Sequence, residues 1–201
     1  MTPWVAGIDE VGRGCLAGPV YAAAVVLRQD AEIPGLADSK RLSPCARERL
    51  VPVIRAAALS WAIGTAEVAE IDAVNILQAT FRAMRRAVFA LTRVPDLCLV
   101  DGNRSPRLGV PVRTIVGGDH IEPCIMAASV IAKVARDAEM VRLATNYPGY
   151  GLARHKGYGT PEHLRALARL GPCGIHRLSF APCARLATPA SRVATDRSVR
   201  G

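Results

Sequence analysis

Four acidic side chains share one property: each lies at or just after the end of an apolar segment typical of a buried strand. These residues are Asp9, Glu10, Asp101 and Asp119. Functional crevices of open α/β sheets lie at strand ends, so the four carboxylates could converge there. Like charges gathered in one place destabilise a protein unless cations lie between them, and hard divalent metals prefer oxygen ligands. Four carboxylates around two divalent ions are a standard arrangement for hydrolysing a phosphodiester.

The residues that follow Asp9 and Glu10 favour a site over a surface turn. Taken alone, the two acids could be a polar loop at a strand end, and Asp101 could be a turn-forming residue. The segment Gly12-Arg13-Gly14 comes directly behind them. Glycines allow a backbone to lie close to a phosphate, and the arginine guanidinium matches phosphate geometry.

The fourth ligand has competitors in the sequence. Glu122 and Asp137 lie near enough to Asp119 in the chain to take its place. We favour Asp119, because Asp137 falls well inside a predicted helix. There we expect it to pair at the surface with Arg136 or Lys133.

The elements that must position these residues alternate between strand and helix patterns. Apolar runs predict strands at residues 4–8, 20–27, 59–64, 97–100 and 112–116. Helical spacing predicts helices at residues 44–54, 75–91, 123–145 and 161–170, with a short helical turn at 67–71. Ser43 and Thr160 are the predicted N-caps of the first and last of these helices. Strands early in the chain, with helices between and after them, predict an α/β domain with a helical C-terminal region.

Composition points to a globular protein with a polyanionic partner. The 201 residues can form one full core, with 50% hydrophobic and 21% charged residues. The formal net charge of +9 favours nucleic acid as that partner. Part of the excess comes from arginines after Phe180, which we expect to form a flexible basic tail.

Cysteine usage and hydropathy predict a soluble cytoplasmic protein. The six cysteines form no Cys-x-x-Cys pair, and no histidine lies at zinc-finger spacing, so we expect them to be reduced. Asp9 and Glu10 come before any apolar run that could serve as a signal peptide. The most apolar window, residues 56–66, is far shorter than the roughly 20 residues that a membrane helix needs.

Several segments, in order along the chain, resemble the motifs of the bacterial ribonuclease HII family. They are residues 7–14, 38–40, 100–102, 118–119, 127–134 and 156–160, with His176-Arg177 and Ser179-Phe180 near the C-terminus. The resemblance implies an RNase H-like fold: a central five-stranded mixed sheet flanked by helices, plus a C-terminal helical region. It further implies a catalytic domain at 1–145, a helical region at 146–182 that completes the substrate cleft, and the basic tail at 183–201.

The resemblance also assigns roles to individual residues. Asp9, Glu10, Asp101 and Asp119 match the family's four metal-binding catalytic acids, which would hold Mg²⁺ or Mn²⁺. The residues implied in substrate binding are Gly12, Arg13, Gly14, Tyr158, Lys40 and Lys133. Gly12-Arg13-Gly14 would read the ribose 2′-hydroxyl, which only RNA presents, and the adjacent phosphate. Tyr158 would stack on the next sugar, and the two lysines would lie near the nucleic-acid backbone.

The activity implied is that of an endoribonuclease acting on RNA–DNA hybrids and on duplex DNA that contains ribonucleotides. It would cut 5′ of a ribonucleotide, leave 3′-hydroxyl and 5′-phosphate ends, and serve ribonucleotide repair and primer removal. A monomer is expected. Three alternatives stay open: a nucleotide-binding glycine loop, a non-catalytic hybrid-binding module, and an RNase H-fold resolvase or integrase. The first fits poorly, because the glycine spacing is wrong and a strand, not a helix, follows.

Some residues depart from the family pattern or carry no assigned role. Cys15 stands where a small or apolar residue is more usual, so an oxidant could affect the glycine loop. Cys173 replaces a threonine, with no evident chemical consequence. His155, His163 and His176 could be structural or catalytic.

Overall fold

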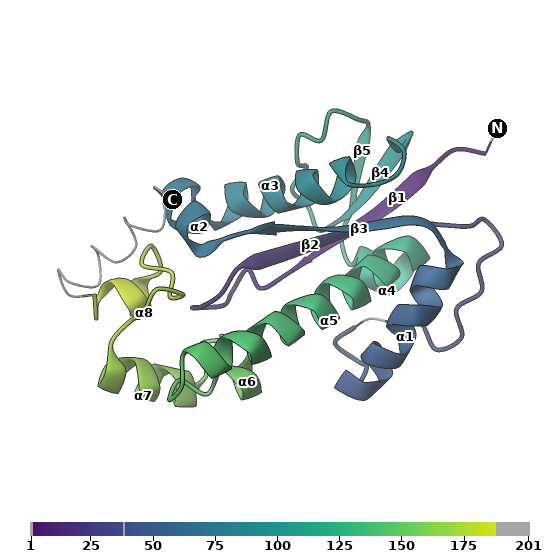
Figure 1. The fold of residues 1–201 in the computed structure, drawn as a ribbon. Helices are drawn as coiled ribbons and strands as arrows, with labels where there is room; N and C mark the ends of the chain where they lie inside the picture. The colour runs from purple at the N-terminus through teal and green to yellow at the C-terminus, as the bar shows by residue number, and fades with distance from the viewer. Residues whose placement is uncertain (1, 38, 188–201) are drawn as a thin grey trace. The chain divides into compact units, whose positions relative to one another are not determined.

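The computed structural model of the protein describes residues 2–37 and 39–187 (Figure 1). Two predictions fall in part on other residues. Asp38 of the motif at 38–40 lies outside the described residues, and so do residues 188–201 of the predicted basic tail.

A single five-stranded sheet forms the centre of the fold. Its strands are β1 (Val5–Val11), β2 (Val20–Leu27), β3 (Ala58–Ala66), β4 (Leu97–Asp101) and β5 (Val112–Ile115). They lie in the order β3-β2-β1-β4-β5. β1 runs antiparallel to β2 and parallel to β4, and β4 runs parallel to β5, so the sheet is mixed as predicted.

Helices fill the connections and the C-terminal part of the chain. They are α1 (Pro44–Ala57), α2 (Val68–Val74), α3 (Ile76–Phe89), α4 (Gly118–Ile121), α5 (Pro123–Asn146), α6 (Leu152–His155), α7 (Pro161–Leu170) and α8 (Ala181–Ala184). The predicted capping holds: Ser43 accepts a hydrogen bond from the Ala46 N–H at the start of α1, and Thr160 accepts one from the His163 N–H at the start of α7. The single-turn helices α4, α6 and α8 were not predicted, because one turn is too short to show a helical period. In the part of the chain that the structure describes, no helix is long and apolar enough to span a bilayer.

The described chain divides into two compact units, each drawn from separate segments. Of the described residues, the first unit takes in 2–11, 21–37, 39–65 and 80–135, and the second takes in 12–20, 66–79 and 136–187. The long helix α5 belongs to both, with its first half in one unit and its second half in the other.

The first unit is built in layers around the sheet. Helix α1 and residues 127–132 of α5 pack against one face, where Ala23 and Val25 of β2 join a buried apolar cluster. Trp61 and Ile63 of β3 lie against the same cluster. Gly64 therefore points to the other face, where its missing side chain leaves room for the α3 backbone (Figure 1).

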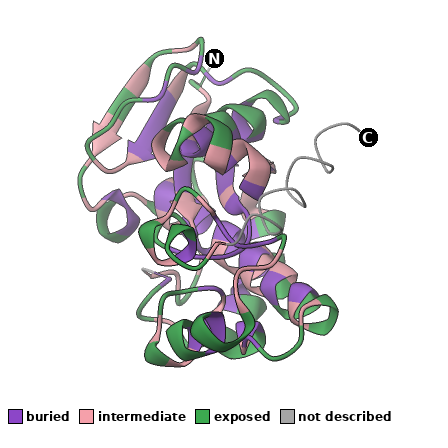
Figure 2. Ribbon diagram, turned by 90° about the vertical axis from the view of Figure 1, so that its left-hand side faces the viewer, coloured by how far each residue is buried: buried purple, intermediate pink, exposed green. Residues whose placement is uncertain are grey.

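The second unit has a separate apolar core. Its buried residues come from the loop after β1, the end of α5, α6, α7 and α8: Leu16, Ala17, Met140, Leu143, Tyr150, Leu152, Ala166, Leu167, Ile175 and Cys183. Helices α1 and α7 alternate between buried and exposed residues, whereas residues 127–132 of α5 are all buried; Figure 2 shows the burial classes along the chain. The loop after β1 is therefore part of a packed core and is not a free surface turn.

Close packing of β1 against α5 depends on one glycine. A Cβ atom built on Gly7 would lie 2.2 Å from the Cys124 carbonyl carbon, a backbone atom that no side-chain rotation can move.

We expect Gly7→Ala to lower the free energy of unfolding by about 2 kcal/mol or more, because α5 must shift off the strand. Urea unfolding measures this loss. Gly174→Ala is the matched control: its Cβ would make only an ordinary contact of 3.7 Å with the Tyr147 hydroxyl, so equal losses in both variants would contradict the packing argument.

Candidate active site

The carboxyl ends of two parallel strands bring Asp9 and Asp101 together. Ile8 of β1 lies opposite Val100 of β4, so the next residues, Asp9 and Asp101, are neighbours across the strand pair. Glu10 follows on β1, and its backbone N–H donates to Asp9 Oδ1 at 2.7 Å. The parallel pairing thus gathers three of the predicted acids at one edge of the sheet.

A tight turn after β5 delivers the fourth acid. Gly117 adopts a left-handed conformation with φ of 69°, and α4 begins at the next residue. Asp119 in α4 is 2% exposed, and its backbone N–H donates to Asp101 Oδ1 at 3.4 Å. The structure therefore brings all four predicted acids together within the first unit.

Asp9 is held in surroundings that disfavour its charge. Burial raises the pKa of this carboxyl to about 8, and the neighbouring charge of Glu10 adds to the shift, with a smaller contribution from Asp101. A hydrogen bond from Ser129 acts in the opposite direction but does not cancel it. Metal-free protein therefore carries a proton on Asp9 near neutral pH, and a cation that binds there must displace it.

Polar residues of α5 and of the loop before α1 support this edge, among them two serines and an arginine with no predicted role. Ser129, which bonds Asp9, shares a 2.8 Å hydrogen bond with Ser39, and both serines are buried. The buried Arg47 donates to the Ser39 carbonyl at 2.7 Å and so fixes that loop. Lys133 lies one helical turn after Ser129 on α5 and is half-buried. Both serines lie in motif segments, Ser39 in 38–40 and Ser129 in 127–134, so the family resemblance was the signal that could have identified them.

Lys40 supplies a positive charge to the acidic cluster. Its Nζ lies 2.9 Å from Asp119 Oδ2, and its side chain is 75% exposed where that of Asp119 is 4% exposed. His120 Nε2 lies 3.6 Å from the other Asp119 oxygen. An exposed ammonium on a flexible stem can move away, so this contact leaves the Asp119 carboxylate available to a competing cation.

The carboxylate oxygens of the four acids are the kind of ligand that hard divalent cations bind, although the side chains as they stand do not enclose an ion. Carboxylate oxygens are the preferred ligands of Mg²⁺ and Mn²⁺, and four carboxylates lie at this edge of the sheet. Among residues 2–37 and 39–187, no three His, Cys, Asp or Glu side chains lie close enough to surround an ion. Binding would require the Lys40 ammonium to leave Asp119 and the Asp9 carboxyl to lose its proton.

The two competing acids occupy different positions. Glu122 caps the C-terminus of α4 through its backbone N–H, which donates to the Gly118 carbonyl. Asp137 belongs to the second unit. Of the two surface partners expected for Asp137, Arg136 does not qualify, because it is fully buried and donates to backbone carbonyls. Pairing of Asp137 with Lys133 stays a prediction.

The glycine loop directly follows β1 in the chain and lies in the second unit. Gly12 has φ of +94°, and a Cβ there would lie 2.1 Å from Arg136 Nε, so only glycine fits. Arg13 and Gly14 are exposed, and a Cβ on Gly14 would meet no atom within 4 Å. Space around Gly14 is therefore open for a ligand.

Tyr158 lies beside this loop. Cys15 and Tyr158 form an isolated antiparallel bridge, and the Leu16 N–H donates to the Gly157 carbonyl at 2.8 Å. The Tyr158 side chain keeps 39% of its surface exposed, enough to offer a ring face to a ligand. Cys15 is fully buried, which argues against the expectation that an oxidant reaches the loop through this thiol.

Two of the three histidines, His163 and His176, form a buried hydrogen-bonded chain, and His155 stacks against it. His176 Nδ1 accepts from the Cys173 N–H, His176 and His163 share a bond between their Nε2 atoms at 3.1 Å, and His163 Nδ1 lies 2.9 Å from the Tyr158 carbonyl. Only neutral rings satisfy all of these bonds, with His176 donating to His163 and His163 donating to Tyr158. Burial lowers the pKa of His176 to about 4 and lowers that of His163. The arrangement supports the structural reading, and His155 stacks on His163 with centroids 4.4 Å apart.

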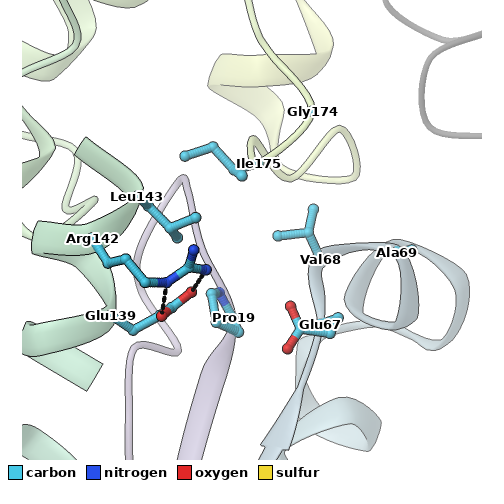
Figure 3. Close-up of a pocket in the computed structure, with 9 residues that line it drawn as sticks. All are labelled: Pro19, Glu67, Val68, Ala69, Glu139, Arg142, Leu143, Gly174 and Ile175. Atoms are coloured by element: carbon cyan, nitrogen blue, oxygen red, sulfur yellow. Dashed lines mark hydrogen bonds and ion pairs between the residues drawn. The ribbon is translucent and has the colours of Figure 1, made fainter. Parts of the chain in front are cut away.

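A cavity of about 300 Å³ in the second unit contains none of the predicted site residues (Figure 3). Its walls include Val68, Leu143 and Ile175, and the ion pair between Glu139 and Arg142 lies at its side. A long polyanion needs an open surface, so the acid cluster and the glycine loop are better candidates than this cavity.

Comparison with known proteins agrees with this geometry. The family model for ribonuclease HII matches residues 6–183, which include every predicted site residue. The chain belongs to the ribonuclease HII family. A ribonuclease HII from Nitrosococcus oceani is 59% identical over 181 residues, covering 90% of each chain. The predicted ribonuclease HII-type endoribonuclease is therefore confirmed.

Solved structures of related enzymes share the fold. Ribonuclease H2 from Pyrococcus horikoshii matches with a TM-score of 0.76 and 25% identity, over 98% of this chain and 99% of that one. Bst-RNase HIII in complex with Mn²⁺ matches with a TM-score of 0.70 and 21% identity, over 97% of this chain and 71% of that one. The predicted RNase H-like fold, with its five-stranded mixed sheet, is confirmed.

The raised pKa of Asp9 makes the stability of the metal-free protein depend on pH. Because the folded state binds this proton more tightly than the unfolded state does, the stabilisation from protonated Asp9 is complete below pH 3.8 and is lost as pH rises through about 8. Asp9→Asn removes the charge, so in chelator its melting temperature should exceed that of the wild type by a margin that grows from pH 5 to pH 8. Each pKa unit is worth about 1.4 kcal/mol, so the effect is on the order of a few kcal/mol.

Divalent cations should reverse that order. Mg²⁺ or Mn²⁺ should raise the melting temperature of the wild type and have much less effect on Asp9→Asn. A margin independent of pH, or equal responses to the cation, would contradict the assignment of Asp9.

Proposed function

We propose that the protein is a divalent-metal-dependent endoribonuclease that hydrolyses the RNA strand of RNA–DNA hybrids and cuts 5′ of single ribonucleotides in duplex DNA. The products would carry 3′-hydroxyl and 5′-phosphate ends. The observation that carries the proposal is the gathering of Asp9, Glu10, Asp101 and Asp119 at one sheet edge, where burial and the neighbouring acids raise the pKa of Asp9. Family membership over residues 6–183 supports the same conclusion.

The four carboxylates would hold two ions, Mg²⁺ or Mn²⁺. When bound, such ions activate a water molecule and stabilise the departing oxygen of the phosphodiester. The chain itself contributes the spacing of the carboxylates, fixed by the β1–β4 register, and the Ser129 hydrogen bond that orients Asp9. Lys40 would leave Asp119 and turn its ammonium toward the nucleic-acid backbone.

Substrate selection would belong to the glycine loop and Tyr158. Gly12, Arg13 and Gly14 would contact the ribose 2′-hydroxyl and the adjacent phosphate, since Arg13 and Gly14 are exposed and Gly14 has open space around it. Tyr158 would stack on the following sugar with its exposed ring face. Lys133 and the +9 net charge would strengthen binding to the phosphate backbone.

The cellular setting follows from this chemistry. We propose that the enzyme acts as a cytoplasmic monomer in removal of misincorporated ribonucleotides and RNA primers, with its six cysteines as free thiols. Residues 1–145 would form the catalytic domain, residues 146–182 would complete the substrate cleft, and the basic segment from 183 would add nonspecific affinity.

The test is cleavage of a labelled DNA duplex that carries one ribonucleotide, with Mg²⁺ or Mn²⁺. Wild type should cut at its 5′ side, and Asp119→Asn should lower the rate by at least about a hundredfold, because it removes charge from the reacting centre. Glu122→Gln is the matched control and should cut like the wild type.

Equal rates for wild type and Asp119→Asn would overturn the assignment of the fourth acid. Equal cutting of an all-DNA duplex would favour a resolvase or integrase activity, and binding without cutting would favour a non-catalytic module.

A further inference from the structure

Two arginines lie inside the second unit with their charges turned to backbone carbonyls. Arg136 and Arg177 are both 0% exposed. Arginine is rarely buried unless its donors are satisfied, because a buried guanidinium loses its hydration. The donors of each are used on the loop that follows β1 or on the segment beside it.

Arg177 holds the glycine loop itself. Its Nη2 donates to the Gly12 carbonyl at 2.7 Å, and its Nη1 donates to the Arg13 carbonyl at 2.9 Å. Nε and Nη2 donate to the Gly18 carbonyl at 3.0 and 2.8 Å. One planar side chain thus fixes both ends of the loop from the inside.

Arg136 holds different peptide groups. Its Nε donates to the Pro19 carbonyl at 2.9 Å, Nη2 to the Ala17 carbonyl at 3.1 Å, and Nη1 to the Lys156 carbonyl at 2.9 Å. These three carbonyls differ from those of Gly12 and Arg13, although the Arg136 Nε also limits the space at Gly12. The two arginines therefore bind different carbonyls of the loop: Arg177 binds those of Gly12, Arg13 and Gly18, and Arg136 binds those of Ala17 and Pro19.

The carbonyls bound by Arg177 determine where the neighbouring N–H groups point. In a trans peptide the C=O and N–H groups lie on opposite sides, so a Gly12 carbonyl directed inward turns the Arg13 N–H outward. The Arg13 carbonyl turns the Gly14 N–H outward in the same way. Successive N–H groups on one side of a loop make a concave site for anionic oxygens.

We propose that Arg177 is a positioning residue that sets the ribonucleotide preference of the enzyme by orienting the N–H groups of Arg13 and Gly14. The inference rests on the proposed function, because it assumes that this loop reads the ribose and its phosphate. Arg177 acts through the backbone and does not itself touch the substrate. Its neighbour His176 bridges Ala17, and Asp72 accepts from the backbone N–H groups of Leu178 and Ser179, so the segment that carries Arg177 is anchored on both sides.

Arg177→Lys tests the proposal, because a lysine keeps the charge but cannot reach three carbonyls in a planar fork. Binding is measured by fluorescence anisotropy in chelator, so that no strand is cut, with a duplex carrying one ribonucleotide and with the same all-DNA duplex. The ratio of the two dissociation constants is the preference. Arg177→Lys should lower this preference by about tenfold, the loss of one good hydrogen bond to a charged group. Its affinity for all-DNA duplex should fall less, because that duplex presents the phosphate to the loop but no 2′-hydroxyl.

Arg136→Lys is the matched control, since it is the same change at equal burial on carbonyls outside Gly12 and Arg13. It should lower the melting temperature as Arg177→Lys does yet keep the preference. Equal loss of the ribonucleotide preference in both variants would show that Arg177 has a merely structural role, and would overturn the proposal. A folded Arg177→Lys variant that keeps the full preference would also overturn it. A wild type without any preference would instead overturn the proposed function.

A second measurement decides the matter if Arg177→Lys does not fold. Amide hydrogen exchange of the wild type in chelator should show more protection of the Arg13 and Gly14 N–H groups with the ribonucleotide duplex than with the all-DNA duplex. Equal protection in both complexes would mean that these N–H groups do not read the ribose, and the proposal would fail.

Discussion

The repulsion among carboxylates at the ends of β1 and β4 is the constraint on which the site depends. Parallel pairing makes Asp9 and Asp101 neighbours by register, and the turn into α4 adds Asp119. Nothing in a sheet requires acids at these positions, and burying Asp9 beside Glu10 disfavours its charged form. Such an arrangement is unfavourable for the protein alone and becomes favourable when divalent cations bind.

The first unit meets this constraint with few and adjustable partners. Ser129 donates to Asp9 from α5, and the exposed Lys40 reaches Asp119. The Ser129 hydroxyl is neutral, and the Lys40 ammonium is exposed on a flexible stem. The carboxylates are thus oriented while remaining able to exchange these partners for metal ions.

The second unit solves the opposite electrostatic problem. There the buried charges are positive, and Arg136 and Arg177 satisfy them with carbonyl dipoles of the loop that follows β1. This choice stiffens a glycine-rich segment that would otherwise be mobile. The histidine chain from Cys173 to the Tyr158 carbonyl stiffens the neighbouring segment with neutral rings.

The sequence was sufficient for those features that local patterns encode. Apolar runs ending in Asp9, Asp101 and Gly118-Asp119 gave the strands and the acids at their ends, and capping at Ser43 and Thr160 gave two helix starts. It could not show that Arg136 is buried, since a helix with polar residues at that spacing normally turns an arginine to solvent. The contact between Lys40 and Asp119 and the tautomers of the histidines depend on distant segments meeting, which no local pattern records.

The pKa of Asp9 tests the central claim most directly. Carbon-detected NMR of the metal-free protein can follow the Asp9 carboxyl through a pH titration, with Asp9→Asn to assign its signal. The account predicts a pKa of about 8 without metal and a fall of that value when Mg²⁺ is added. A titration near the ordinary value of 3.8 in the folded, metal-free protein would contradict it.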